Sequence, residues 1–176
     1  MGEASAAFQR LATAPRQELE RLLMTGEAPR IDAFPGFEYR GFNHSRVTAA
    51  FRIRKFLKTF FTNGGAVLGC NSPVVQNGLD DRWIPLPNET EPRRYAYFGV
   101  VPVDAESRDN RYLHAVLLDY GRTRTSWRDP SRVLRDYVVR VERGSDEVLL
   151  GKAYLALGPL RAPLGFFVLE RRRRVD

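Results

Sequence analysis

The sequence predicts a mainly β fold, an antiparallel barrel that carries short N-terminal helices, and three observations support this fold class. From residue 66 onward, short apolar runs alternate with polar connections rich in glycine and proline, which is typical of consecutive antiparallel strands. A helical period of three and four occurs only near the N-terminus and over residues 45–61. The length of 176 residues fits one domain whose core needs no disulfide or structural metal.

The N-terminal part is predicted to be helical. Residues 3–14 and 16–25 form two short helical stretches that are separated by a proline. In the second stretch, leucines recur at helical spacing and Gly26 supplies a stop signal. We therefore divide the chain into an N-terminal helical segment, 1–26, and a single barrel domain, 27–176.

The first strand is expected at residues 37–43, where Phe37, Tyr39 and Gly41 share one face. Residues 45–61 are then predicted to form an amphipathic helix, because their apolar side chains recur at intervals of three and four. The polar side of this helix would carry Arg52, Arg54, Lys55 and Lys58.

The rest of the chain is predicted to be strands, at residues 66–75, 95–103, 112–120, 133–142, 148–157 and 165–172. Seven strands with one helix inserted after the first match a barrel in which a helical segment caps one mouth. An α+β cone, in which a curved sheet wraps over the N-terminal helices, is the alternative. Both architectures place a pocket against the concave face of the sheet.

Several short motifs add a resemblance. They are Phe42-Asn43, Arg54-Lys55-Phe56, Asp119-Tyr120-Gly121, Arg135-Asp136-Tyr137, Leu149-Leu150-Gly151-Lys152-Ala153 and Phe166-Phe167-Val168-Leu169-Glu170-Arg171. In these motifs the chain resembles a group of uncharacterised bacterial proteins with a lipocalin-like or fatty-acid-binding-like β-barrel. The resemblance spans residues 27–174 and implies a late arginine that packs across the barrel bottom. It implies no activity.

The charge of the chain points to no specific partner. The net charge is +7 and the isoelectric point about 10.0, but the basic residues are almost all arginine, with lysine only at Lys55, Lys58 and Lys152. Arginine-rich, lysine-poor usage also follows from a GC-rich genome, so we do not predict a nucleic-acid partner. No secretion signal and no apolar run of spanning length is present, so a cytoplasmic, bacterial protein is expected.

The chain lacks the common enzymatic signatures. It contains no phosphate-binding Walker loop, no dinucleotide glycine pattern, no His-Glu-x-x-His and no Gly-x-Ser-x-Gly. Cys70 is the only cysteine, and with His44 and His114 it cannot complete a four-ligand zinc site. We predict no metal and no other cofactor. The candidates for acid–base chemistry in a pocket are His114, Asp119 and Asp136.

Ionisable residues within apolar strands are the best candidates for a binding site. Lys152 shares a strand face with Leu150 and Tyr154, and a lysine that cannot reach water must meet a carboxylate. Glu170 or Asp136 is the expected partner. Buried tyrosine hydroxyls also need partners. The predicted ligand-binding residues are Tyr39, Asn43, His114, Tyr137, Lys152, Tyr154 and Glu170.

These patterns favour a binding protein for a small apolar or amphipathic ligand held in a barrel cavity. One alternative is a small hydrolase or isomerase that uses a pocket histidine or aspartate. Another is binding to phosphate or to a membrane surface, without spanning it, through the basic helix and its residues Arg52, Arg54, Lys55 and Lys58. The oligomeric state is left open.

Overall fold

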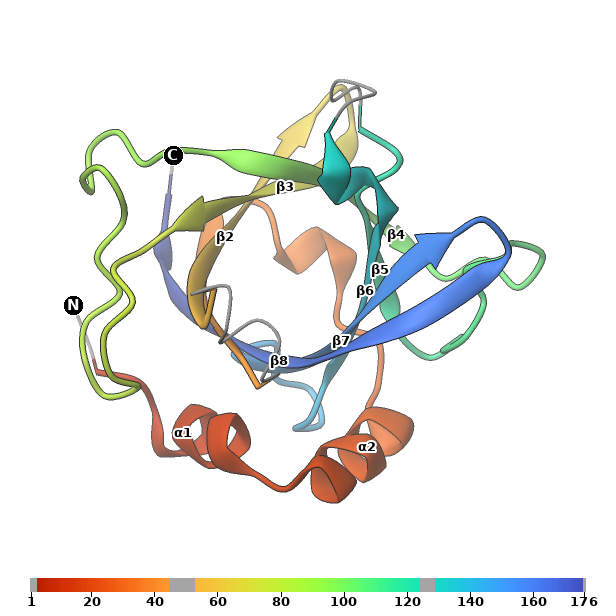
Figure 1. The fold of residues 1–176 in the computed structure, drawn as a ribbon, viewed down its shortest axis with the longest axis horizontal. Helices are drawn as coiled ribbons and strands as arrows, with labels where there is room; N and C mark the ends of the chain where they lie inside the picture. Colours follow the sequence, from red (N-terminus) through yellow and green to blue (C-terminus); the bar gives the residue numbers. More distant parts are fainter. Residues whose placement is uncertain (1–2, 45–52, 124–128, 176) are drawn as a thin grey trace.

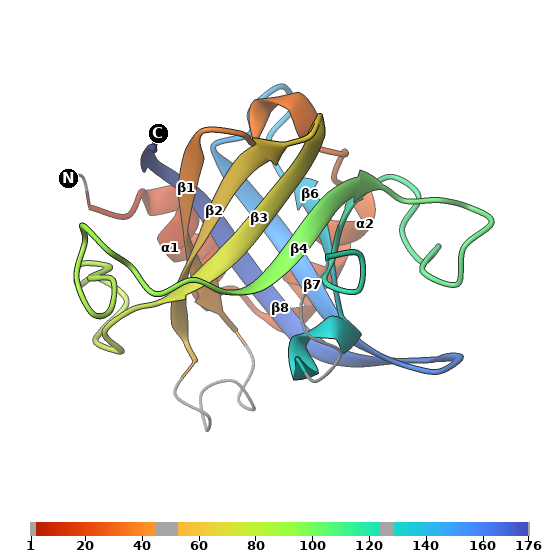
Figure 2. The same ribbon diagram turned by 90° about the horizontal axis from the view of Figure 1, so that it is seen from above.

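The computed structural model describes residues 3–44, 53–123 and 129–175, and in this part of the chain eight antiparallel strands form a closed barrel (Figure 1). Consecutive strands are neighbours, and β1 pairs with β8 to close the barrel. The strands are β1 (Phe37–Asn43), β2 (Lys55–Asn63), β3 (Ala66–Pro73), β4 (Tyr95–Pro102), β5 (Val116–Asp119), β6 (Leu134–Arg140), β7 (Val148–Leu157) and β8 (Leu160–Arg174). The predicted antiparallel barrel with N-terminal helices is thus confirmed, and Figure 2 shows the tilt of its strands.

Two helices cover one side of the outer wall. α1 (Ala6–Thr13) packs on β8 and α2 (Arg16–Thr25) packs on β7, as the lower part of Figure 1 shows. The side chain of Ser5 caps α1 by accepting a hydrogen bond from the Phe8 N–H, 3.2 Å away. Because the helices lie outside a closed barrel, the cone alternative is wrong. No helix within the described residues is long and apolar enough to cross a membrane.

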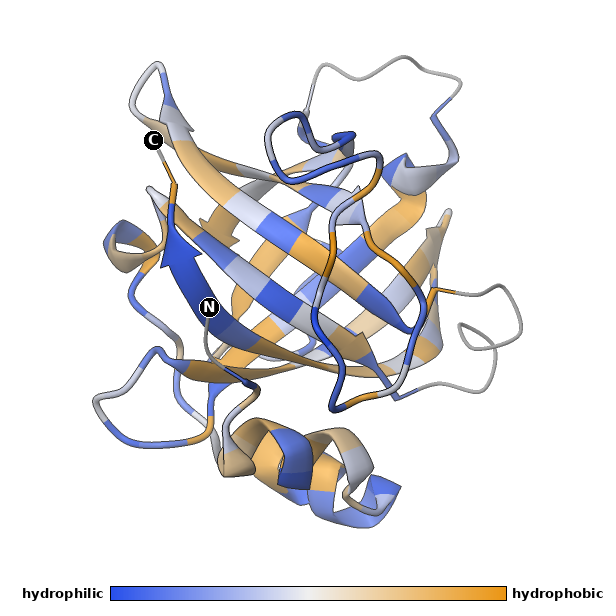
Figure 3. Ribbon diagram, turned by 90° about the vertical axis from the view of Figure 1, so that its left-hand side faces the viewer, coloured by the Kyte–Doolittle hydropathy of each residue, from blue (hydrophilic) through white to orange (hydrophobic). Residues whose placement is uncertain are grey.

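Strand alternation sorts the side chains into an inner and an outer core. Figure 3 shows hydrophobic and hydrophilic positions alternating along the strands. The inner core includes Tyr39, Phe60, Phe98, Leu118 and Leu169. The outer core joins the apolar faces of α1 and α2 to outward-facing residues such as Leu57, Tyr137, Leu150 and Val168.

The segment after β1 differs most from the prediction. Residues 45–52 lie outside the described residues, and the second half of the predicted helix is strand β2, which pairs with β1 and β3. Both faces of β2 are buried: Phe56 and Phe60 face inward, and Leu57 faces outward. A strand that is apolar on both faces has apolar residues at spacings of three and four, which is why it resembles a helix in sequence.

One end of the barrel is filled by aromatic side chains. Phe34, which follows the short 3-10 helix Ile31–Ala33, places its ring centroid 4.6 Å from that of Phe60 and 5.8 Å from that of Tyr39. At the same end, the Arg171 guanidinium lies 4.3 Å from the Phe37 ring centroid, and its Nε donates to the Tyr39 hydroxyl over 3.2 Å. A late arginine therefore packs across this end of the barrel.

Candidate functional site

The other half of the barrel contains a cavity of about 760 Å³. This volume lies in the range of small-molecule sites, which is roughly 300–1,000 Å³. Inward-facing residues from β2, β4, β6, β7 and β8 supply its apolar lining. They include Phe56, Ala96, Leu134, Ala153, Leu155 and Phe167.

Four polar side chains of the lining form one hydrogen-bonded group, which we call the Lys58 cluster: Lys58, Asn71, Tyr120 and Asp136. Lys58 Nζ donates to Asn71 Oδ1 at 3.0 Å, to the Tyr120 hydroxyl at 2.5 Å and to Asp136 Oδ2 at 3.2 Å. The Tyr120 hydroxyl donates to Asp136 Oδ2 at 2.9 Å. Asn71 Nδ2 donates to the Tyr120 hydroxyl at 3.3 Å and to the Ala96 carbonyl at 3.1 Å. β2, β3 and β6 and the residue that follows β5 thus meet at one point.

Aromatic rings surround the Lys58 ammonium. Nζ lies 4.7, 5.4 and 5.6 Å from the ring centroids of Phe98, Phe56 and Phe167. Each ring lies over an inward-facing glycine whose added Cβ would overlap the ring: Gly69, Gly41 and Gly151, in the same order. The absence of a side chain at these glycines therefore lets the rings pack flat against the wall beside the ammonium.

Burial controls the ionisation of the cluster. Desolvation lowers the pKa of Lys58, although the Asp136 carboxylate opposes this change. Desolvation, followed by the charge of Asp136, raises the pKa of Tyr120 well above its usual range. The Tyr120 hydroxyl therefore keeps its proton and acts as the donor to Asp136.

A second lysine lies on the outer wall, in what we call the Lys152 cluster: Lys152, Glu20, Tyr112 and Tyr154. Lys152 Nζ donates to Glu20 Oε1 and Oε2 at 2.7 and 2.8 Å, and to the Tyr112 hydroxyl at 3.2 Å. The hydroxyls of Tyr112 and Tyr154 are 2.7 Å apart. This cluster fastens α2 to β7.

The partners predicted for Lys152 were therefore wrong. Asp136 points into the cavity, whereas Lys152 points away from it. Glu170, on the outer face of β8, pairs with Arg40 over 3.2 Å and accepts a hydrogen bond from the Ser5 N–H over 3.1 Å. The prediction considered only carboxylates on strands, and the actual partner Glu20 comes from the helix that covers this face.

The other predicted ligand-binding residues are scattered. Asn43 lines the cavity, and its Nδ2 donates to the Ile53 carbonyl over 2.6 Å. Tyr39 lies at the filled end, and Tyr137 lies in the outer core beside the rings of Tyr112 and Tyr154. His114 also lies on the outer wall, with Nε2 2.9 Å from the Leu23 carbonyl oxygen.

Within residues 53–61, which the structure describes, the predicted basic helix face is not formed. Arg52 lies outside the described residues, and Arg54 is exposed just before β2. Lys55 is buried beside Trp83, with Nζ 3.7 Å from the ring centroid, and it donates to the carbonyls of Gly78 and Asp81. Lys58 points into the barrel. The spacing of these residues places them on a strand, so they do not share a solvated helix face.

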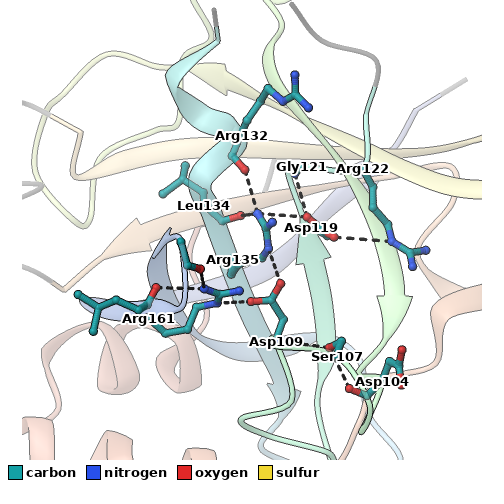
Figure 4. Close-up of polar contacts among 12 residues, drawn as sticks. Asp104, Ser107, Asp109, Asp119, Gly121, Arg122, Arg132, Leu134, Arg135 and Arg161 are labelled. Carbon is teal, nitrogen blue, oxygen red and sulfur yellow. Dashed lines mark hydrogen bonds and ion pairs between the residues drawn. The ribbon is translucent and has the colours of Figure 1, made fainter. Parts of the chain in front are cut away.

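Of the acid–base candidates, Asp136 alone lines the described part of the cavity. Asp119 belongs to an outer network, shown in Figure 4, in which Arg135 contacts Asp119 over 3.2 Å and Asp109 over 2.8 Å. Asp109 also pairs with Arg161. Burial acts to raise the pKa of Asp109, but the two arginines outweigh it and hold the pKa below its usual value. This network attaches the loop between β4 and β5 to the barrel wall.

Sequence reasoning missed Asn71 and Tyr120 as site residues and assigned Lys58 to a surface. The signal that could have located Lys58 is its place between Phe56 and Phe60, because alternation within a strand puts all of them on one face. The convergence of Tyr120 and Asp136 on Lys58 depends on strand pairing across the barrel, which no local pattern reveals.

Comparison of the chain with protein-family models, curated proteins and solved structures finds no match. The structure supports the resemblance to lipocalin-like proteins only in its closed eight-stranded antiparallel architecture. No comparison places the chain in a bacterial group. Within the described residues, no group of three His, Cys, Asp or Glu side chains could hold a metal ion. The geometry of the cavity is thus the basis for assigning a function.

Proposed function

We propose that the barrel binds a small apolar or amphipathic molecule in its cavity. The observation that carries this proposal is the cavity itself, about 760 Å³ in volume, with an apolar wall and one concentrated polar cluster. A large apolar lining with a few convergent polar groups is the usual composition of a small-molecule site.

The distribution of side-chain size supports the proposal. An eight-stranded barrel is just wide enough either to be filled by side chains or to hold one small ligand. In this barrel, rings such as Phe34 and Phe60 fill one half, whereas small residues such as Ala96 and Ala153 line the other half. Unfilled space inside a protein is destabilising, so a cavity confined to one half is better explained by an occupant than by packing.

A fluorescence titration tests the proposal. N-phenyl-1-naphthylamine is a neutral apolar probe whose emission rises when it leaves water, and we expect it to bind the wild-type protein. Ala153→Trp would fill the cavity, because Ala153 lies in the lining, and we expect it to abolish the rise. Ala156→Trp makes the same change three residues further along β7, on the outer face, and we expect it to leave binding intact. Equal binding by both variants would place the probe outside the barrel and refute the proposal.

A further inference from the structure

We propose that the polar end of the ligand is a hydrogen-bond donor without negative charge, an alcohol or a protonated amine, and that Asp136 Oδ1 accepts its hydrogen bond. This inference rests on the proposed function, because it names the chemical class that the same cavity takes. It follows from the hydrogen bonds that the Lys58 cluster makes within itself.

The ammonium of Lys58 has no donor left for a ligand. An ammonium carries three N–H donors. Those of Lys58 have three acceptors in Asn71 Oδ1, the Tyr120 hydroxyl and Asp136 Oδ2. A ligand carboxylate could reach this ammonium only by displacing one of these acceptors.

The other donors of the cluster are used as well. The single O–H of Tyr120 is given to Asp136 Oδ2. The two N–H groups of Asn71 go to the Ala96 carbonyl and the Tyr120 hydroxyl. The cluster can therefore offer a ligand only acceptors.

One acceptor of the cluster is left open. Asp136 Oδ2 receives hydrogen bonds from both Lys58 and Tyr120, whereas Oδ1 has no hydrogen bond to any of the residues that the structure describes. Asp136 also lines the cavity. A carboxylate oxygen that faces an apolar cavity is satisfied by an O–H or N–H group and repelled by another carboxylate.

The charge of the lining favours the same class. Among the described residues that line the cavity, Lys58 is the one cation, and Asp129 and Asp136 are the two anions. Tyr95 and Ser131 add neutral hydroxyls, which can donate or accept and so do not discriminate. An anionic head group would raise the excess of negative charge, and a neutral or cationic one would not.

Three ligands with the same undecyl chain test the inference: 1-undecanol, undecylamine and dodecanoate. Each competes with N-phenyl-1-naphthylamine near neutral pH. Because the apolar part is constant, the ratio of their dissociation constants reports the head group. We expect the alcohol and the amine to bind at least about tenfold more tightly than dodecanoate, since an unpaired or repelled buried polar group costs about 1–3 kcal/mol.

A pair of double variants locates the effect. The double variant Lys58→Met with Asp136→Leu removes the inner ion pair, and we expect the three ligands then to bind within about threefold of one another, because the head group loses its partner. The double variant Lys152→Met with Glu20→Leu removes the outer pair in the same way, and we expect it to keep the wild-type preference. Asp136→Asn, which replaces the carboxylate by a neutral amide, is the second inner variant. We expect it to reduce the difference in affinity between dodecanoate and the other two ligands.

The outcomes separate the inference from the proposed function. Dodecanoate that binds as tightly as undecanol would overturn the inference and leave the cavity as a ligand site. If none of the three ligands and no probe binds, the proposed function itself falls. An unchanged preference in both inner variants would show that Asp136 does not receive the head group.

Discussion

Each side of the barrel wall carries a cluster in which a lysine contacts a carboxylate and a tyrosine hydroxyl, but the surroundings of the two clusters differ. Inside, Lys58 pairs with Asp136 and Tyr120; outside, Lys152 pairs with Glu20 and Tyr112. The side chains of Lys58 and Asp136 are 2% and 7% exposed, whereas Glu20 is 40% exposed. Both members of the inner pair are therefore buried, whereas one member of the outer pair, Glu20, reaches solvent.

The two clusters differ in what their burial can contribute to the protein. A buried ion pair stabilises a protein little compared with apolar residues, so its retention beside a cavity calls for another reason. Under our proposal, a ligand supplies such a reason: both hydrogen bonds of the Asp136 carboxylate within the cluster go to Oδ2, and the ligand would donate to Oδ1. Lys152, in contrast, lies under α2 and links this helix to β7 through its ion pair with Glu20.

Removal of Asp136 alone should have the largest effect on stability. Asp136→Leu leaves the Lys58 ammonium buried without its carboxylate, and we expect a loss of about 3–5 kcal/mol in the free energy of unfolding, measured by urea denaturation. The double variant Lys58→Met with Asp136→Leu should recover most of this loss, because no unpaired charge remains. A single variant as stable as the wild type would mean that the inner pair is hydrated.

A substitution at Gly151, which lies against the Phe167 ring, tests the packing of the rings around the Lys58 cluster. Gly151→Ala would push its Cβ into this ring, and we expect a loss of about 1–3 kcal/mol, as for other overpacked cores, with a weaker affinity for the cavity probe. Gly99→Ala is the control, because an added Cβ there meets its neighbours at ordinary contact distances of 3.6 Å or more. Equal stability of the two variants in urea would contradict the close packing of ring and wall.

The outer cluster should affect stability but not binding. Lys152→Met leaves Glu20 able to turn toward solvent, so we expect a loss of only about 1–2 kcal/mol, from the hydrogen bonds of the ammonium. The affinity for N-phenyl-1-naphthylamine should stay at the wild-type value. A variant that binds the probe much more weakly at unchanged secondary structure would return Lys152 to the ligand site.

The pH dependence of stability should differ in sign between the two lysines. Burial lowers the pKa of Lys58 below 10.5. Between the folded pKa and 10.5, the unfolded chain therefore binds more protons than the folded chain does. The contribution of Lys58 to the free energy of unfolding thus rises with pH in that window. For Lys152, burial acts to lower the pKa, but the hydrogen bonds to Glu20 and Tyr112 raise it above 10.5. Its contribution is therefore complete below 10.5 and is lost as pH rises through the folded pKa.

Urea titrations between about pH 8 and pH 11 can measure both effects. The stability of the wild type relative to the Lys58→Met, Asp136→Leu double variant should rise with pH up to 10.5. The stability of the wild type relative to the Lys152→Met variant should stay level up to pH 10.5 and decrease above this pH. Parallel curves for the two comparisons would show that the lysines have the same environment.

Much of the fold was predictable because alternation is local. The strand at 37–43 and the strand at 148–157 were predicted with their observed bounds, and the two N-terminal helices were also found. β2 was missed, since apolar residues on both of its faces imitate a helical period. The error carried over to Lys58, which was placed on a solvated surface instead of inside the barrel.

The candidate site was much harder to predict, because its members meet only through the closure of the barrel. Lys58 and Asp136 are separated by 78 positions in the sequence, and Lys152 and Glu20 by 132. A lysine between apolar neighbours in the sequence indicates that its charge needs a partner, but only the three-dimensional structure identifies that partner. For the same reason, Asp136 was recognised as a candidate residue and given the wrong lysine.

The most direct test of the account is a crystal structure of the protein with 1-undecanol. We predict electron density for the alkyl chain along the apolar lining beside Ala153 and Leu155, with the hydroxyl oxygen within hydrogen-bond distance of Asp136 Oδ1. An empty cavity at saturating alcohol, or density only on the outer wall beneath α1 and α2, would contradict the claim that the interior of the barrel is the binding site.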